Sequence, residues 1–241
     1  MEDQLGRIEL KVRPLRVLQL LLTISALSIL VSLVLRLMWV SGRLQGMNFT
    51  INELLNVDAE GNPPTWFGSM MLFTSALLAL AIAQKNSGAQ GRGWYILAAA
   101  LTWMSLDESS SLHEQAGRPL RDLFDTSGVL YFAWVLLAIP LVLVIGALVL
   151  PVLSSLKGLE KRNLFIAGGL YLAGALGGEM VSGLESDDFQ SSRYVIVTHT
   201  EEALEFAGAA FLIFALSSIA IRMSGRAPLA PETSNTAVGG S

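Results

Sequence analysis

The sequence has no cysteine, and charged residues make up only 15% of its 241 positions. Without cysteine, the chain itself forms no disulfide, thiolate zinc site, iron–sulfur cluster or cysteine nucleophile. Soluble domains of this size usually carry about 25% charged residues. The low charge, together with a hydrophobic fraction of 52%, argues against an ordinary soluble protein. Histidine is also rare, and His113 and His199 are the two in the chain.

The charged residues are clustered, and they leave long apolar runs between the clusters. A helix needs about 20 mostly apolar residues to cross a bilayer. Six segments meet this requirement, so the sequence predicts an all-α fold, a polytopic membrane helical bundle with six transmembrane helices. The predicted spans are residues 15–40, 66–84, 94–114, 129–153, 163–181 and 198–221.

Lysine and arginine are unevenly divided between the two ends of these spans. Cytoplasmic loops of membrane proteins carry an excess of both residues. If the N-terminus is cytoplasmic, 11 of the 16 basic residues lie inside and 15 of the 20 acidic residues lie toward the outside. We therefore expect both termini in the cytoplasm. The expected organisation is a cytoplasmic N-terminal segment 1–14, a six-helix transmembrane domain 15–222 with an outer loop 41–65, and a disordered cytoplasmic tail 223–241.

Ionisable residues interrupt the outer parts of three predicted spans. Counting about 1.5 Å per residue from the inner end of each span places these residues at a similar depth, near the outer third of the bilayer. Ionisable groups inside a membrane are costly and usually functional. The three spans could therefore form one site from Asp107, His113, Glu114, Glu179, His199, Glu201, Glu202 and Glu205. Glu108 is a weaker candidate, because it points away from the helix face that carries Asp107.

Imidazole and carboxylate groups together are typical ligands of zinc, iron and manganese. We interpret four residues as ligands of one such divalent ion, namely His113, Glu179, His199 and Glu202. Three further carboxylates are predicted to be catalytic, as a general base or as additional ligands, namely Asp107, Glu114 and Glu205. A structural reading stays open for some of them, because His199 could equally be a solvated residue at a helix start and Asp107 could belong to a structural pair.

Glycine predicts how the fifth and sixth spans meet. Gly174 and Gly178 are four residues apart and therefore share one face of a helix. Small residues at this spacing let membrane helices approach closely. This predicts close packing of the two spans and favours a shared site.

Four motifs resemble those of a family of bacterial multispan membrane proteins that has no characterised activity. They are Asn62-Pro63-Pro64-Thr65-Trp66, Leu106-Asp107-Glu108 with Leu112-His113-Glu114, Gly178-Glu179-Met180, and Glu201-Glu202 with Glu205. The resemblance covers most of the chain, from the first loop to the sixth span. It implies a bacterial protein and no reaction. Together with the orientation expected from lysine and arginine, it predicts a bacterial inner-membrane location with the site facing the periplasm or outside.

The sequence leaves three functions open. The first is a metal-dependent intramembrane enzyme that acts on a lipid-like substrate. The second is a non-catalytic subunit or assembly factor of a larger membrane complex. The third is an ion or proton transporter, which is disfavoured because the inner halves of all six predicted spans lack charged residues. The expected partners are the lipid bilayer and a lipid-like substrate or other membrane subunits, and no nucleic acid.

Overall fold

The computed structural model describes residues 13–44 and 49–225, and helices make up the regular structure of these residues. The predicted cytoplasmic N-terminal segment and tail lie almost entirely outside them. The elements in chain order are α1 (Pro14–Val40), α2 (Phe49–Leu54), α3 (Pro63–Ala83), α4 (Gly88–Ser110), α5 (Leu112–Phe124), η1 (Gly128–Leu130), α6 (Val135–Ser155), α7 (Gly158–Leu172), η2 (Ala173–Gly178), α8 (Glu179–Ser182), η3 (Gly183–Glu185) and α9 (Ser192–Met223).

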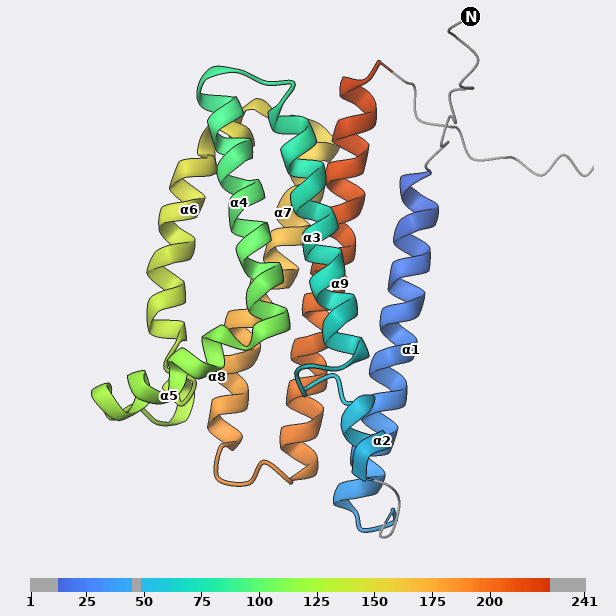
Figure 1. The fold of residues 1–241 in the computed structure, drawn as a ribbon, viewed down its shortest axis with the longest axis vertical. Coiled ribbons are helices and arrows are strands. Elements are labelled where there is room, and N and C mark those ends of the chain that lie inside the picture. Colours follow the sequence, from blue (N-terminus) through green and yellow to red (C-terminus); the bar gives the residue numbers. More distant parts are fainter. Residues whose placement is uncertain (1–12, 45–48, 226–241) are drawn as a thin grey trace, which may run out of the picture.

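The long helices lie side by side in one bundle (Figure 1), with α9 at its centre. Helix α9 packs against α1, α3, α7 and η2. In its most apolar stretch 56% of the residues are buried, against 17% in α1 and in α6, which lie at the periphery. The first turn of α1 and the last turn of α9 lie at the same end of the bundle (Figure 1).

Five stretches within the described residues are long and apolar enough to cross a membrane. They are α1, α3, α6, the stretch Gly158–Glu185 that runs from α7 to η3, and α9. Helix α4 has 23 residues and packs along α3 and α6, but it is less apolar than these five. The chain is thus an all-α, multispan membrane protein, and a sixth crossing by α4 stays a prediction.

Helix α4 ends earlier than the predicted third span, which extends to residue 114. It stops at Ser110 because Ser111 adopts a left-handed conformation with φ of 52°. The Asp107 carboxylate then accepts the backbone N–H of His113 at 2.9 Å and satisfies a donor at the start of α5. The chain bends after Ser110, and α5 runs at an angle to α4 at the lower end of the bundle (Figure 1).

The packing of the fifth predicted span against α9 confirms the glycine prediction. Gly174 and Gly178 lie in η2, a π-helical turn between α7 and α8. A Cβ at Gly174 would lie 2.6 Å from Glu205 Cγ, and a Cβ at Gly178 would lie 2.5 Å from Glu201 Cγ. Both distances are shorter than van der Waals contact, so only glycine lets these acidic side chains of α9 fit against η2.

Asn62 makes several of the hydrogen bonds that hold the loop before α3. Asn62 Oδ1 accepts the backbone N–H of Thr65 and caps α3, with Pro63 at the first helical position. Its Nδ2 donates to the carbonyl oxygens of Glu53, Asn56 and Ala59 at 3.1, 2.6 and 2.8 Å. These bonds fold the outer loop back over the lower end of the bundle and fix the backbone that carries Asp58 and Glu60.

Candidate functional site

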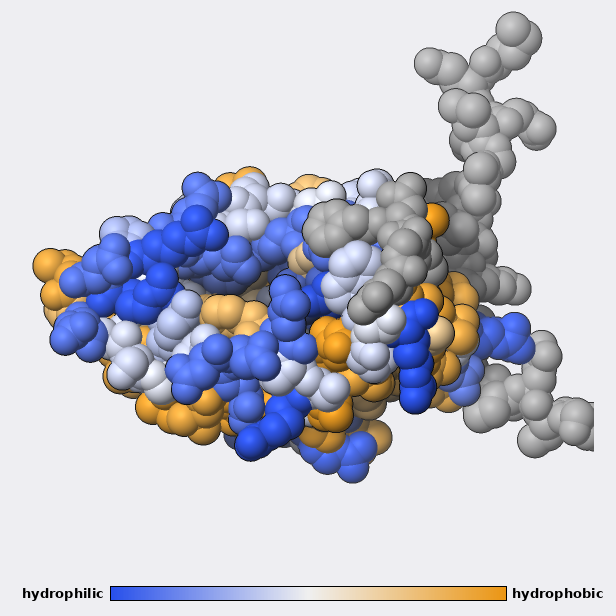
Figure 2. Space-filling model, turned by 90° about the horizontal axis from the view of Figure 1, so that it is seen from below, coloured by the Kyte–Doolittle hydropathy of each residue, from blue (hydrophilic) through white to orange (hydrophobic). Residues whose placement is uncertain are grey.

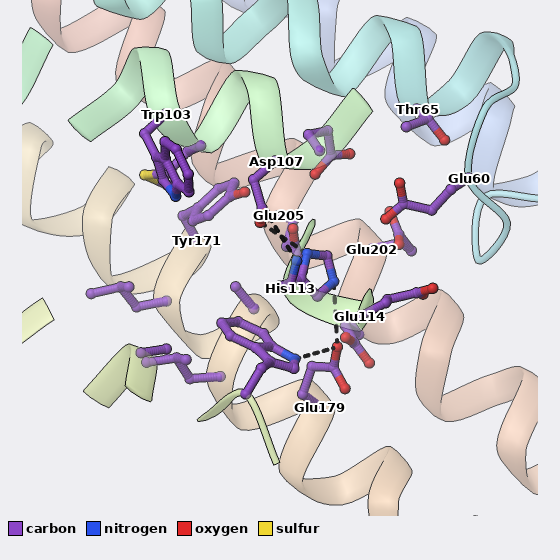
Figure 3. Close-up of a pocket in the computed structure, with 18 of the residues that line it drawn as sticks. Glu60, Thr65, Trp103, Asp107, His113, Glu114, Tyr171, Glu179, Glu202 and Glu205 are labelled. Atoms are coloured by element: carbon purple, nitrogen blue, oxygen red, sulfur yellow. Dashed lines mark hydrogen bonds and ion pairs between the residues drawn. The ribbon is translucent and has the colours of Figure 1, made fainter. Parts of the chain in front are cut away.

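A cavity of about 430 Å³ lies between the outer loop, α4, α5, α6, η2 and α9. Its lining divides into two chemically different parts. Acidic side chains come from the loop and from the lower ends of the helices, where Figure 3 shows them pointing toward one another. Apolar side chains from deeper in the bundle line the rest, and they are Ala100, Trp103, Met104, Ala138, Leu141, Val142, Ile145, Leu172, Ala175 and Leu176.

Nine carboxylates line the acidic part, namely Asp58, Glu60, Asp107, Glu108, Glu114, Glu179, Glu201, Glu202 and Glu205. Among the described lining residues, His113 is the only basic side chain. The end of the bundle that carries the loop and α5 presents mostly hydrophilic residues, with hydrophobic ones at its edges (Figure 2). So many carboxylates in one partly buried space need protons or bound cations to offset their mutual repulsion.

His113 is held in one orientation by Asp107. Asp107 Oδ2 lies 2.8 Å from His113 Nδ1, while Oδ1 of the same carboxylate accepts the His113 backbone N–H. The His113 ring also packs on the Trp134 ring, with 4.8 Å between the centroids. A carboxylate bonded to one imidazole nitrogen leaves the other nitrogen as the metal-binding atom, which is the usual arrangement behind a metal-bound histidine.

Among the described residues, Glu60, His113 and Glu114 form a group that could hold a metal ion. One ligand atom of each lies within 4.8 Å of the other two. Glu60 comes from the outer loop, and His113 and Glu114 come from the first turn of α5; Figure 3 shows the three side chains near one another. Ser111 Oγ donates to Glu60 Oε2 at 2.5 Å and holds that carboxylate in place. Two carboxylates and one imidazole form a donor set that suits zinc, iron or manganese.

Glu179, the first residue of α8, is a further carboxylate close to His113. Its Oε1 accepts the Trp134 indole N–H at 3.2 Å and lies 3.9 Å from His113 Nε2. Its Oε2 is buried without a hydrogen-bond partner. Since a buried carboxylate oxygen without a partner is costly, this atom is where a proton or a cation would compensate the charge.

Glycines also make room for the acidic side chains that lie deeper. A Cβ at Gly68 of α3 would lie 2.8 Å from Glu108 Oε1, as Gly174 similarly leaves space for Glu205. Glu108, the weaker candidate from the sequence, lines the same cavity as Glu202 and Glu205.

His199 is the predicted ligand that the structure does not bring to the cavity. Its Nε2 is within 2.8 Å of Ser32 Oγ in α1, and its Nδ1 is within 2.7 Å of the Val195 carbonyl oxygen. Both ring nitrogens thus have partners, and the side chain is 97% buried between α9 and α1. The other predicted site residues line the cavity, namely Asp107, His113, Glu114, Glu179, Glu202 and Glu205.

The electrostatic environment perturbs the groups at the cavity mouth. Burial raises the pKa of Asp58 to about 7, although Arg36 counteracts it, and burial also raises the pKa of Glu60. For His113, burial lowers the pKa, but the hydrogen bond and negative charge of Asp107, followed by Glu179, outweigh burial and raise it to about 9. Shifts of this kind in a cleft are typical of functional sites.

Two residues of the site were missed by the sequence analysis. Asp58 and Glu60 belong to the outer loop 41–65, in which the sequence predicted no site residue. The sequence feature that points to them is their position a few residues before Asn62-Pro63, where α3 begins. The hydrogen bonds of Asn62 fold this part of the loop back over the bundle.

Comparisons with known proteins identify a family for this chain but no reaction. Neither the curated proteins nor the solved structures give a match to the chain. A family described as a domain of unknown function, DUF8692, matches residues 18–219, which include every long helix of the bundle in whole or in large part. The chain therefore belongs to the DUF8692 family.

Proposed function

We propose that this protein is a metal-dependent intramembrane enzyme that acts on a lipid-like, amphipathic substrate. The observation that carries the proposal is the two-part lining of one cavity of about 430 Å³. Histidine and carboxylates at the mouth suit a divalent cation, and the apolar part leads from them into the membrane-spanning part of the bundle. A substrate with a polar group at one end and a hydrocarbon chain at the other matches both parts.

In this proposal Glu60, His113 and Glu114 bind a zinc, iron or manganese ion. Asp107 orients His113 through the 2.8 Å contact with Nδ1. Glu179 and Glu202 are further ligands, supported by the unpartnered buried Oε2 of Glu179 and by the position of both side chains in the cavity lining. His199 is left out because both of its ring nitrogens are occupied.

The chemistry proposed for the site is metal-assisted attack on the polar end of the substrate. A divalent ion held by Glu60, His113 and Glu114 would activate water for attack near neutral pH. Glu205 lines the cavity between the acidic and the apolar parts, beside Tyr171, and is the proposed general base that takes the proton of this water.

The proposed topology has six crossings, which are α4 and the five long apolar stretches. Both termini are in the cytoplasm and the site is outside. Among the described residues, the end of the bundle opposite the site carries the larger share of basic side chains, namely Arg13, Arg16, Lys85, Arg92, Lys157, Lys161, Arg162 and Arg222. This asymmetry supports a bacterial inner-membrane protein whose site faces the periplasm.

The test of the metal site is elemental analysis of detergent-purified protein. The parent should retain close to one equivalent of zinc, iron or manganese. His113→Ala and Glu60→Gln should lose it, whereas His199→Gln should keep it. Absence of metal from the parent after reconstitution with each of the three ions would rule out the proposed function.

The test of catalysis is a comparison of lipids from cells that produce the parent or the Glu205→Gln variant. Glu205→Gln keeps the proposed ligands Glu60, His113 and Glu114, so it should retain metal but not convert substrate. Lipid species that accumulate with this variant and disappear with the parent identify the substrate. Identical lipid profiles, in the presence of bound metal, would contradict an enzymatic role on lipids.

A second candidate, a non-catalytic subunit of a membrane complex, is favoured by one feature. Helix α5 projects at the lower end of the bundle (Figure 1), and its last residues, Leu123 and Phe124, are 74% and 56% exposed. Exposed apolar side chains at such a position suit a partner subunit or the membrane surface. Co-purification of a stoichiometric partner that is lost with Leu123→Ser/Phe124→Ser would support this candidate.

A further inference from the structure

A second, smaller cavity of about 220 Å³ lies beside α5 and shares lining residues with the first. Glu114 and Trp134 line both cavities, so the two share a wall at the proposed metal site. Apart from Glu114, the ionisable groups at the second cavity differ from those of the first. They are Arg118, Arg121 and Tyr131, and Gly117, Phe132 and Phe189 complete the lining.

The two arginines are placed to act together. Arg118 and Arg121 are three residues apart on α5 and therefore project from one side of the helix. The guanidinium carbon of Arg121 lies 4.3 Å from the centre of the Tyr131 ring. Stacking on an aromatic face restricts the side chain, while the guanidinium N–H groups stay available in the plane of the group.

Neither arginine forms an ion pair with a carboxylate among the described residues, although the cavity next to them is acidic. Other arginines at this end of the bundle do pair. Arg36 contacts Glu53 at 3.3 Å and Arg193 contacts Glu185 at 2.9 Å. Two unpaired guanidinium groups that line one small cavity form a donor arrangement that matches phosphate or carboxylate oxygens.

We propose that Arg118 and Arg121 form an anion subsite that binds a phosphate or carboxylate group at the polar end of the substrate. The anion lies beside the metal site because Glu114 and Trp134 line both cavities, and the hydrocarbon chain passes this shared border into the apolar part of the first cavity. The assignment of this anion to the substrate rests on the proposed function. The binding of an anion by the two arginines does not depend on the metal.

The experiment is isothermal titration calorimetry of the full-length protein in uncharged detergent, after bound metal has been removed with EDTA and the EDTA has been removed by dialysis, so that neither metal nor chelator contributes. The probes are dihexanoyl phosphatidic acid, inorganic phosphate and uncharged dihexanoylglycerol. Phosphatidic acid should bind the parent, and Arg118→Gln/Arg121→Gln should weaken that binding by about tenfold or more, the scale of one lost charge-assisted contact. The control Arg43→Gln/Arg193→Gln removes the same charge at the same end of the bundle and should change the affinity less than about twofold.

A second variant covers the case in which the double glutamine variant does not fold. Arg118→Lys/Arg121→Lys keeps both charges but removes the planar donor fork, and an intermediate loss of affinity is expected. Tighter binding of phosphatidic acid than of inorganic phosphate would support a lipid-borne anion, and equal affinities would support a free anion at the same subsite. Unchanged binding in the arginine variants, or equal binding of dihexanoylglycerol, would overturn the proposal.

Metal content, measured on the same purified proteins before any chelator is added, separates the two proposals. If the parent retains metal but the arginine substitutions leave anion binding unchanged, the subsite is refuted and the proposed function stands. If anion binding depends on the arginines but no metal is retained, the subsite stands and the metalloenzyme proposal fails.

Discussion

Asp107 contacts His113 twice, with one carboxylate oxygen 2.9 Å from the backbone nitrogen and the other 2.8 Å from Nδ1 of the ring. The first contact stabilises the start of α5, and the second sets which ring nitrogen faces the cavity. One side chain thus couples the bend between α4 and α5 to the orientation of the imidazole. The fold and the proposed metal site therefore depend on the same carboxylate.

Asp107→Asn is expected to weaken metal binding by about 10–100-fold, the usual effect of losing a carboxylate behind a ligating histidine. The asparagine amide can still cap α5 through its oxygen, but its NH₂ group donates to Nδ1 and favours the wrong tautomer for coordination. Competition with a chromophoric zinc chelator measures the affinity. Asp122→Asn, an exposed acid on α5, is the control, and equal affinities for both variants would contradict the role of Asp107.

The metal-free protein should lose stability as the pH rises from about 6.5 to 9. Burial lowers the His113 pKa, but Asp107 and Glu179 raise it from 6.5 to about 9 in the folded state. The folded state then binds the proton more tightly than the unfolded state. The stability that this proton contributes is fully present below pH 6.5, and it is lost as the pH rises through the folded-state pKa of about 9. Thermal unfolding at several pH values in detergent should show the melting temperature falling in this window.

The slope of that pH dependence provides its own control. Asp107→Asn removes the main group that raises the His113 pKa, so the fall in melting temperature between pH 6.5 and 9 should become smaller. A melting temperature that rises through this window, or a slope that Asp107→Asn leaves intact, would show that His113 does not hold its proton in this way.

His199 is expected to stabilise the bundle and not to bind metal. Its contacts with Ser32 in α1 and with Val195 in its own helix join the central helix to a peripheral one. His199→Ala leaves the buried Ser32 hydroxyl without this partner and creates a cavity, at a cost of about 1–3 kcal/mol. The melting temperature should fall while the metal content stays at the parent value, and loss of metal with unchanged stability would restore His199 as a ligand.

Gly174→Ala should destabilise the protein and disturb the acidic part of the cavity. The added methyl group would lie 2.6 Å from Glu205 Cγ and 2.8 Å from the Glu201 carbonyl oxygen, and the latter belongs to rigid backbone. Overpacking of this kind typically costs about 1–3 kcal/mol. The measurement is thermal unfolding of the parent and of Gly174→Ala, each with metal bound.

The control for this substitution lies in the same π-helical turn. A Cβ at Gly177 would have no atom within 4 Å, so Gly177→Ala should be neutral or slightly stabilising through helix propensity. Equal effects of the two substitutions would mean that the close approach of η2 to α9 contributes little to stability.

Much of the bundle could be predicted from the sequence because each long apolar run needs only its own composition to become a buried or lipid-facing helix. The runs that became α1, α3, α6 and α9 were recognised in this way. Counting residues along each run also indicated that Asp107, Glu179 and Glu205 lie at a similar depth, and all three line one cavity. Depth follows from the rise per residue, a local property of the helix.

Tertiary structure decided which of these side chains meet. The sequence treated the two histidines alike, yet packing turns His199 toward Ser32 of α1 and leaves His113 at the cavity. The path of the outer loop, fixed by Asn62, brings Glu60 to His113 across 53 positions of sequence. The rotation of a helix about its axis and the route of a loop depend on contacts between distant segments. A local pattern determines how deep a residue lies, whereas only the packed bundle determines what it faces.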